Sequence, residues 1–218
     1  MNYKVDLHTH SYGSSDGGLK LSDYQALLTT NKLDYIAITD HDRIDIAQEI
    51  NASLGHKIIV GQEITTREGE IIGLFLSSAI APKLSARETA LAIKDQGALV
   101  YIPHPFETVR KGITRSTLDG IADLVDIVEV HNGRAVFQNK GPEATVWARL
   151  HNKVGAASSD AHGIRGVGTS YTTITDVPSA RSLAKLLEKG HLDVKHPPIL
   201  SLLYPKYHRL RDKLKKNH

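Results

Sequence analysis

The chain has 218 residues, a mass of 23.9 kDa and a formal net charge of +3 at pH 7, and hydrophobic residues make up 40% of it. This length and composition predict one well-buried globular domain and exclude a disordered or fibrous chain. The absence of cysteine excludes disulfides and thiolate metal sites.

Strand-like and helix-like segments alternate along the chain. Apolar, β-branched runs predict strands at residues 3–7, 35–39, 57–61, 99–102, 127–130, 154–157 and 171–174. Helical patterns fall between them, at residues 21–30, 44–54, 86–96, 116–122, 142–152 and 179–187. Such alternation predicts an α/β fold built from βαβ units around a parallel sheet, with one extra strand at residues 70–76. We expect a single domain over residues 1–195, because no linker interrupts it.

Polar side chains follow the predicted strands. His8 and His10 project to the same side of the first strand, because strand side chains alternate. Alone, such a pair is more often a solvated feature than a metal site. Further polar residues, however, end the later strands, and the carboxyl ends of a parallel barrel open on one face: Asp40, His41, Glu63, His104, His131, Asp160 and His162. Six of the twelve histidines on one rim indicate a metal site.

The types of these side chains indicate the metal chemistry. Imidazole and carboxylate without thiolate suit Zn, Mn or Fe. The ligands are too many for one ion, so we expect two or three. Glu63 can bridge two ions about 3.5–4 Å apart, an arrangement typical of phosphoester hydrolysis.

The order of these motifs strongly resembles the PHP family, named for polymerase and histidinol phosphatase. The motifs are DLHTHS, SDGG, AITDHD, GQEIT, IPHP, EVHN and SSDAHG, which together cover nearly all of residues 1–170. The resemblance implies a distorted (β/α)7 TIM-like barrel and three divalent ions, Mn, Fe or Zn. It also implies three ligand groups. The first is His8, His10, Glu63 and Asp160; the second is Glu63, His104 and His131; the third is Asp16, His41 and His162.

The resemblance also bears on the substrate. The Asp at position 16, in SDGG, resembles the nucleotide-directed branch of the family, whose members have Asp there, whereas histidinol phosphatases usually have His. That branch commonly carries a helical insertion over the pocket, for which the connection at residues 77–88 leaves no room. We therefore expect an open pocket that accepts a nucleotide or oligonucleotide phosphate.

The ligand set predicts a mechanism. A hydroxide that bridges the first two ions attacks phosphorus, and Glu63, Asp160 and His162 are the expected catalytic residues. Arg134 and Arg165 are predicted to bind the substrate phosphate, because guanidinium groups bind phosphate in a bidentate manner. Arg110 and Lys111 are weaker predictions for the same role.

Three other functions remain open. A metallohydrolase acting on a carbonyl can also use a His-x-His strand, although such enzymes often bridge their metals with a modified lysine. A histidinol-phosphatase-like enzyme would act on a small metabolite. A binding module with a silent site would be expected to have lost ligands.

The C-terminal tail, residues 196–218, is expected to be basic and helical. Residues 204–218 contain six Lys or Arg and one Asp, a net charge of +5, which leaves −2 for the remainder. Such a tail can contact nucleic acid or an anionic surface, and we expect its deletion to spare turnover of small substrates. No signal peptide or membrane span is recognisable, so we expect a cytoplasmic protein that binds a small phosphorylated substrate or a short nucleic acid, with no stable protein partner.

Overall fold

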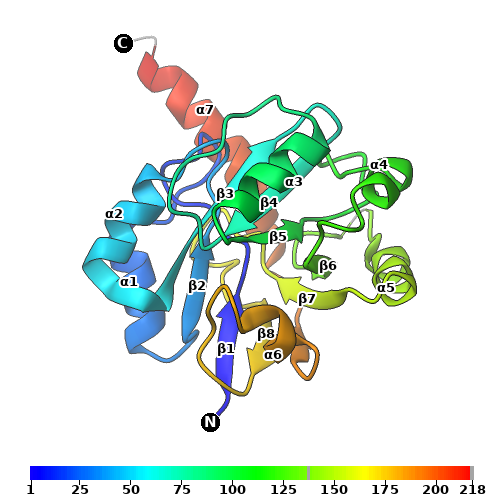
Figure 1. The fold of residues 1–218 in the computed structure, drawn as a ribbon. Helices are drawn as coiled ribbons and strands as arrows, with labels where there is room; N and C mark the ends of the chain where they lie inside the picture. The colour runs from blue at the N-terminus through cyan, green and yellow to red at the C-terminus, as the bar shows by residue number, and fades with distance from the viewer. Residues whose placement is uncertain (137, 217–218) are drawn as a thin grey trace.

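The computed structural model describes residues 1–136 and 138–216, which form an α/β fold with one nine-stranded sheet curved into a nearly closed barrel (Figure 1). The sheet order is β7-β6-β5-β4-β3-β2-β1-β8-β9. The strands are β1 Tyr3–Asp6, β2 Tyr35–Ile38, β3 Ile58–Thr65, β4 Glu70–Leu74, β5 Leu99–Ile102, β6 Ile127–Asn132, β7 Val154–Ser158, β8 Ser170–Ile174 and β9 His191–Val194. The expected distorted TIM-like barrel is confirmed.

Helices connect the strands and cover the outside of the barrel. They are α1 Leu21–Thr29, α2 Asp45–Leu54, α3 Ala86–Asp95, α4 Arg115–Gly120, α5 Gly141–Leu150, α6 Leu183–Leu187 and α7 Tyr204–Lys216, with single 3-10 turns at Gly55–Lys57 and Ile199–Leu203. Local sequence explains their boundaries. Ser85, for example, begins α3 with a reciprocal cap in which its hydroxyl accepts a hydrogen bond from the Glu88 amide.

The sheet departs from a regular parallel barrel at two places. β4, the extra strand that the sequence indicated, is antiparallel to both β3 and β5. β8 runs antiparallel to β1 and is followed by β9, a strand that the sequence did not indicate. A parallel β8 would need a crossover helix after β7, and residues 159–169 contain none.

The barrel closes between β7 and β8 through a side chain. Thr172 of β8 places its hydroxyl 2.9 Å from the amide nitrogen and 3.2 Å from the carbonyl oxygen of Ala157 in β7. No β7–β8 backbone ladder is present among the described residues. This hydroxyl therefore replaces the missing backbone ladder. We call this contact between β7 and β8 the seam of the barrel.

Two apolar clusters hold the helices on the sheet. Ile93, Leu118 and Trp147 pack α3, α4 and α5 against β4–β6, and Tyr24 and Ile50 pack α1 and α2 against β2 and β3. These contacts fix the strands so that the carboxyl ends of β1, β2, β3, β5, β6 and β7 meet on one face. Within the described part of the chain, no helix is long and apolar enough to cross a membrane.

Candidate metal centre

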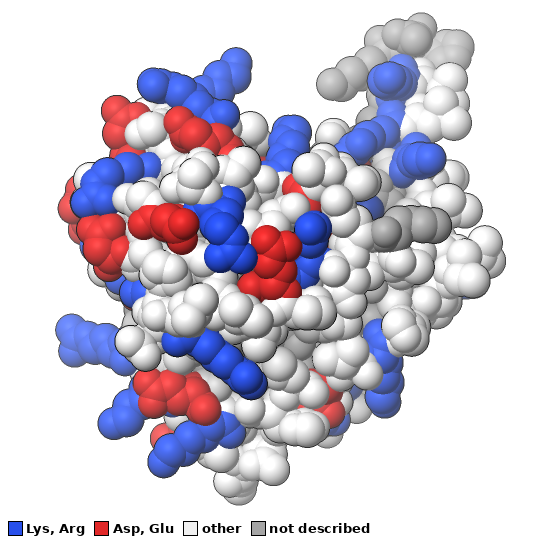
Figure 2. Space-filling model, turned by 90° about the vertical axis from the view of Figure 1, so that its right-hand side faces the viewer, with Lys and Arg blue, Asp and Glu red and all other residues white. Residues whose placement is uncertain are grey.

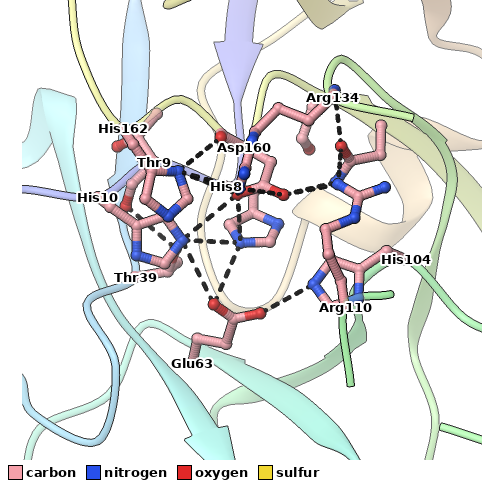
Figure 3. Close-up of polar contacts among 12 residues, drawn as sticks. His8, Thr9, His10, Thr39, Glu63, His104, Arg110, Arg134, Asp160 and His162 are labelled. Atoms are coloured by element: carbon pink, nitrogen blue, oxygen red, sulfur yellow. Dashed lines mark hydrogen bonds and ion pairs between the residues drawn. The ribbon is translucent and has the colours of Figure 1, made fainter. Parts of the chain in front are cut away.

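The first ligand group converges at the carboxyl ends of β1, β3 and β7 (Figure 3). The Nε2 atoms of His8 and His10 are 3.1 Å apart. Glu63 Oε2 lies 3.5 Å and 3.3 Å from them, and Asp160 Oδ1 lies 3.6 Å and 3.5 Å from them. All four side chains are buried. Both imidazole nitrogens thus face the point between them, and an oxygen of each carboxylate lies within 3.6 Å of both nitrogens.

Hydrogen bonds behind the two imidazoles direct their Nε2 lone pairs to that point. His8 Nδ1 lies 3.1 Å from Glu129 Oε1, a carboxylate that can only accept, so Nδ1 carries the hydrogen. His10 Nδ1 lies 3.2 Å from the Ser14 hydroxyl, which itself donates to Asp40 at 2.8 Å. This support is typical of metal-binding histidines.

The donor spacing fits a divalent cation. Ligands about 2.0–2.1 Å from a tetrahedral ion are about 3.3–3.4 Å apart, and the two imidazole nitrogens lie 3.1 to 3.6 Å from each other and from the Glu63 and Asp160 oxygens. Two lone pairs directed at each other between two carboxylates also need a positive charge between them. The residues present therefore fit a bound metal ion.

The third ligand group lies beside the first. Asp16 Oδ1 is 3.6 Å from His41 Nε2, and Asp16 Oδ2 is 3.6 Å from His162 Nε2. His162 Nδ1 donates to the Asp160 carbonyl at 2.9 Å, which leaves its Nε2 lone pair facing Asp16. His10 and His162 stack with their ring centroids 4.1 Å apart, so the first and third groups are contiguous. The structure thus brings together all three predicted residues of this group.

The second ligand group is only partly assembled as predicted. His104 Nε2 lies 3.1 Å from Glu63 Oε1, but His131 belongs to none of the His/carboxylate clusters in the described part of the chain. A β-bulge between Glu129 and His131 shifts the alternation of β6 by one residue. Asn132 consequently takes the inward position, 3.2 Å from Asp160 Oδ2. The structure therefore does not bring His131 together with Glu63 and His104.

Two carboxylates in the centre were missed in the sequence. Glu70 Oε2 lies 3.9 Å from His104 Nε2, and Glu70 Oε1 lies 4.0 Å from His41 Nδ1. Glu70 begins the antiparallel strand β4 opposite Thr65, so it is on the rim although it starts a strand. Glu129 was visible as a charge within the apolar strand IVEVHN, a pattern that indicates a buried functional carboxylate.

The electrostatics are those of a site that requires cations. Although burial opposes it, Asp160 and Glu63 raise the pKa of His8 well above its ordinary value. Burial likewise opposes ionisation of Glu63, but His8 and His41 hold its pKa well below the usual range. Burial, together with His10 and Arg134, lowers the pKa of His162 to about 3. The environment thus favours the ionised form of Glu63, and that charge in turn favours a proton on His8.

Two ligand residues have an unusual backbone. His104 has φ of 29° and Asp160 has φ of 50°, in the left-handed region that side chains other than Gly rarely adopt. The His104 amide donates to Glu129 Oε2 at 2.6 Å, which helps to hold this conformation. Backbone strain of this kind concentrates at functional sites.

The predicted phosphate-binding arginines differ in position. Arg134 lies 3.4 Å from Asp160 Oδ1 and lines a pocket of about 670 Å³ over the ligand groups. Arg165 is exposed and does not line that pocket, because the turn closed by Gly166 N and Gly163 O directs it to solvent. Arg110 is buried, with Nη1 2.8 Å from Asp160 Oδ2 and Nη2 2.5 Å from Glu107. It holds the ligand Asp160 in place (Figure 3).

The fold and site together define a TIM-like barrel with adjoining His and carboxylate clusters at its carboxyl end. The chain is 32% identical to the uncharacterized protein MJ0417 of Methanocaldococcus jannaschii over 178 residues, covering 80% of this chain and 71% of that protein. It is 34% identical to the uncharacterized protein MJ1587 of the same organism over 149 residues, covering 62% of this chain and 87% of that protein. The chain belongs to the family of these two proteins.

Two further comparisons concern the PHP class. A family model described as PHP-associated matches residues 142–192, which include Asp160 and His162. The fold is similar to a two-domain protein from Bacteroides vulgatus that contains a predicted PHP-like metal-dependent phosphoesterase, with a TM-score of 0.72, 19% identity, and coverage of 96% of this chain and 70% of that one. This second likeness shows the shared fold.

Proposed function

We propose that the protein is a PHP-type metal-dependent phosphoesterase that hydrolyses a phosphomonoester. The observation that carries the proposal is the set of adjoining donor clusters with Glu63 at their junction. Glu63 Oε2 faces His8 and His10, and Oε1 faces His104. The PHP-associated match and the PHP-like structural relative support the same class.

The ligand groups have distinct roles in this proposal. His8, His10, Glu63 and Asp160 would hold the first of three Mn, Fe or Zn ions; Glu63 and His104, with Glu70 nearby, would hold the second; and Asp16, His41 and His162 would hold the third. When bound, such ions activate water and neutralise charge at phosphorus. Glu63 joins the first two groups, Asp160 faces the point between His8 and His10, and Arg134 lines the pocket where a phosphate can enter.

A nucleotide or oligonucleotide phosphate is the substrate class that the pocket favours. Residues 75–85 connect β4 to α3 without an inserted helix, so nothing in this segment covers the site. Five cationic side chains line the pocket beside its carboxylates, and cations bound by those carboxylates would leave the lining complementary to a polyanion: Arg110, Lys111, Arg134, Lys206 and Arg209.

A substrate screen tests the proposal. Protein reconstituted with Mn, Fe or Zn is assayed against phosphorylated metabolites, histidinol phosphate, mononucleotides, bisphosphonucleotides, short 5′-phosphorylated RNA and a panel of amides. We expect hydrolysis of nucleotide phosphates and little of histidinol phosphate. Turnover of amides without phosphate esters would refute phosphoesterase activity and favour a carbonyl-directed metallohydrolase.

A further inference from the structure

The C-terminal helix α7 lies against the loops that carry the metal ligands. A Cβ added at Gly18 would lie 2.3 Å from the His208 ring, and one added at Gly163 would lie 2.7 Å from the Tyr204 ring. Gly18 follows Asp16 in SDGG, and Gly163 follows His162 in SSDAHG. Figure 1 shows the helix at the end of the barrel opposite the N-terminus. Because no side chain fits at either glycine, α7 packs directly on the backbone of both ligand loops.

One face of this C-terminal segment forms a wall of the pocket. Leu202, Pro205, Lys206 and Arg209 line it, at the spacing of one helical face. Figure 2 shows Lys and Arg side chains on the projecting C-terminal part of the molecule, at the upper right. Arg209 extends furthest into the site, where its Nη2 lies 2.5 Å from Asp16 Oδ2.

Arg209 differs from the other two pocket arginines in its capacity to bind a ligand. Arg110 is bound to Glu107, Asn132 and Asp160, and Arg134 is largely buried beside Asp160. The side chain of Arg209 is 60% exposed, and Asp16 is its one hydrogen-bond partner among the described residues. The remaining N–H groups of its planar fork are therefore available to an anion.

We propose that Arg209, carried on α7, binds the substrate phosphate at the third ligand group; this rests on the proposed phosphoesterase function. Asp16, His41 and His162 would hold a cation, whose charge would neutralise Asp16 and leave Arg209 to donate to a phosphate oxygen instead of that carboxylate. The guanidinium lies within hydrogen-bond distance of a ligand atom, so it is beside any phosphate on that ion. Guanidinium binds phosphate through two parallel hydrogen bonds, and this geometry gives Arg209 a role in specificity.

The test measures binding of inorganic phosphate to metal-reconstituted protein by titration calorimetry. Arg209→Ala is expected to weaken phosphate binding roughly tenfold or more, because it removes charge-assisted hydrogen bonds. Arg209→Lys, which keeps the charge and loses the fork, should fall between Arg209→Ala and wild type. Lys213→Ala is the matched control, since it removes a cation from the exposed side of the same helix, outside the pocket. It should change the affinity less than twofold.

Metal content and the melting temperature are measured for each variant, and both should match wild type. Unchanged phosphate affinity in Arg209→Ala overturns the assignment, as does failure of wild type to bind phosphate. Tighter phosphate binding in Arg209→Ala also overturns it, because the arginine would then obstruct the site. If wild type binds phosphate through Arg209 but hydrolyses no ester, the phosphoesterase proposal fails while the binding assignment stands.

Discussion

The two aspartates at the edges of the centre are supported differently. Asp160 follows β7, is buried, and accepts hydrogen bonds from Arg110 at 2.8 Å and Asn132 at 3.2 Å. Asp16 lies in the loop after β1, where Arg209 of α7 is its charged partner outside the ligand groups and its Oδ1 atom has no hydrogen bond among the described residues. One half of the centre is thus fixed by the barrel, and the other depends on a loop and on the C-terminal helix. We expect the half around Asp16 to lose its metal first.

The largest effect is expected at the junction of the two halves. Glu63→Gln removes the carboxylate that faces both the first and second ligand groups, and hydrolysis should fall by more than ~100-fold, because even residues that only orient ligands contribute about 10–100-fold. His56→Gln, at a histidine outside all the ligand clusters, is the control and should leave the rate unchanged. Equal rates in the two variants would show that Glu63 is not a ligand.

A pair of substitutions tests the difference between the halves directly. Asp160→Asn should lose metal from the first ligand group and lower the rate by roughly 100-fold or more, whereas Asp16→Asn should lose one ion and lower it by about tenfold. Elemental analysis after dialysis against a chelator measures the metal content of both variants, and an activity assay measures their rates. If Asp160→Asn retained all its metal, the proposed difference between the halves around Asp160 and Asp16 would be wrong.

A smaller effect on metal binding is expected from Glu70, which lies beside the second ligand group. Glu70→Gln should weaken the affinity for the second metal by about 10–100-fold. His131→Gln should leave the metal content unchanged, because the bulge in β6 separates His131 from the clusters. Metal titrations of the two variants compare them. Metal loss on His131→Gln alone would restore the arrangement expected from the motif EVHN.

The smallest effect concerns pH. Although burial opposes it, Glu63 and Asp16 raise the pKa of His41 to about 9, from an ordinary 6.5. At neutral pH the metal-free protein therefore holds a proton on His41, and metal must displace it. Metal affinity should increase as pH rises from 6.5 towards 9, and calorimetry in buffers of different ionisation enthalpy should detect the released proton. The stability that this proton gives to the metal-free protein is present below pH 6.5 and lost as pH passes 9.

The sequence was sufficient where a ligand directly follows an apolar parallel strand. His8, His10 and His104 follow such strands, and Glu63 lies near the carboxyl end of β3. The exceptions have physical causes that a hydrophobic pattern does not contain. A bulge displaced His131, an antiparallel strand brought in Glu70, and a tight turn exposed Arg165.

The position of α7 could not be predicted from composition. A run of six cations in residues 204–218 is typical of a solvated helix, and the packing of Tyr204 and His208 on two loop glycines is a tertiary contact without a local signal. Since α7 lines the pocket, its deletion is now expected to impair turnover of small substrates as well as binding of polyanions.

The seam between β7 and β8 gives the metal centre a mechanical role. His8 and His10 follow β1, Asp160 follows β7, and the two loops are joined where the His10 amide donates to the Ala161 carbonyl at 2.9 Å. β7 forms one side of the junction that the Thr172 hydroxyl closes, and β1 pairs with β8 on the other side. An ion shared by His8, His10 and Asp160 would therefore link the loops after β1 and β7 and stabilise the closure of the barrel at the seam. Metal removal should increase hydrogen exchange at the Ala157 amide more than at amides of β2 or β3, far from the seam.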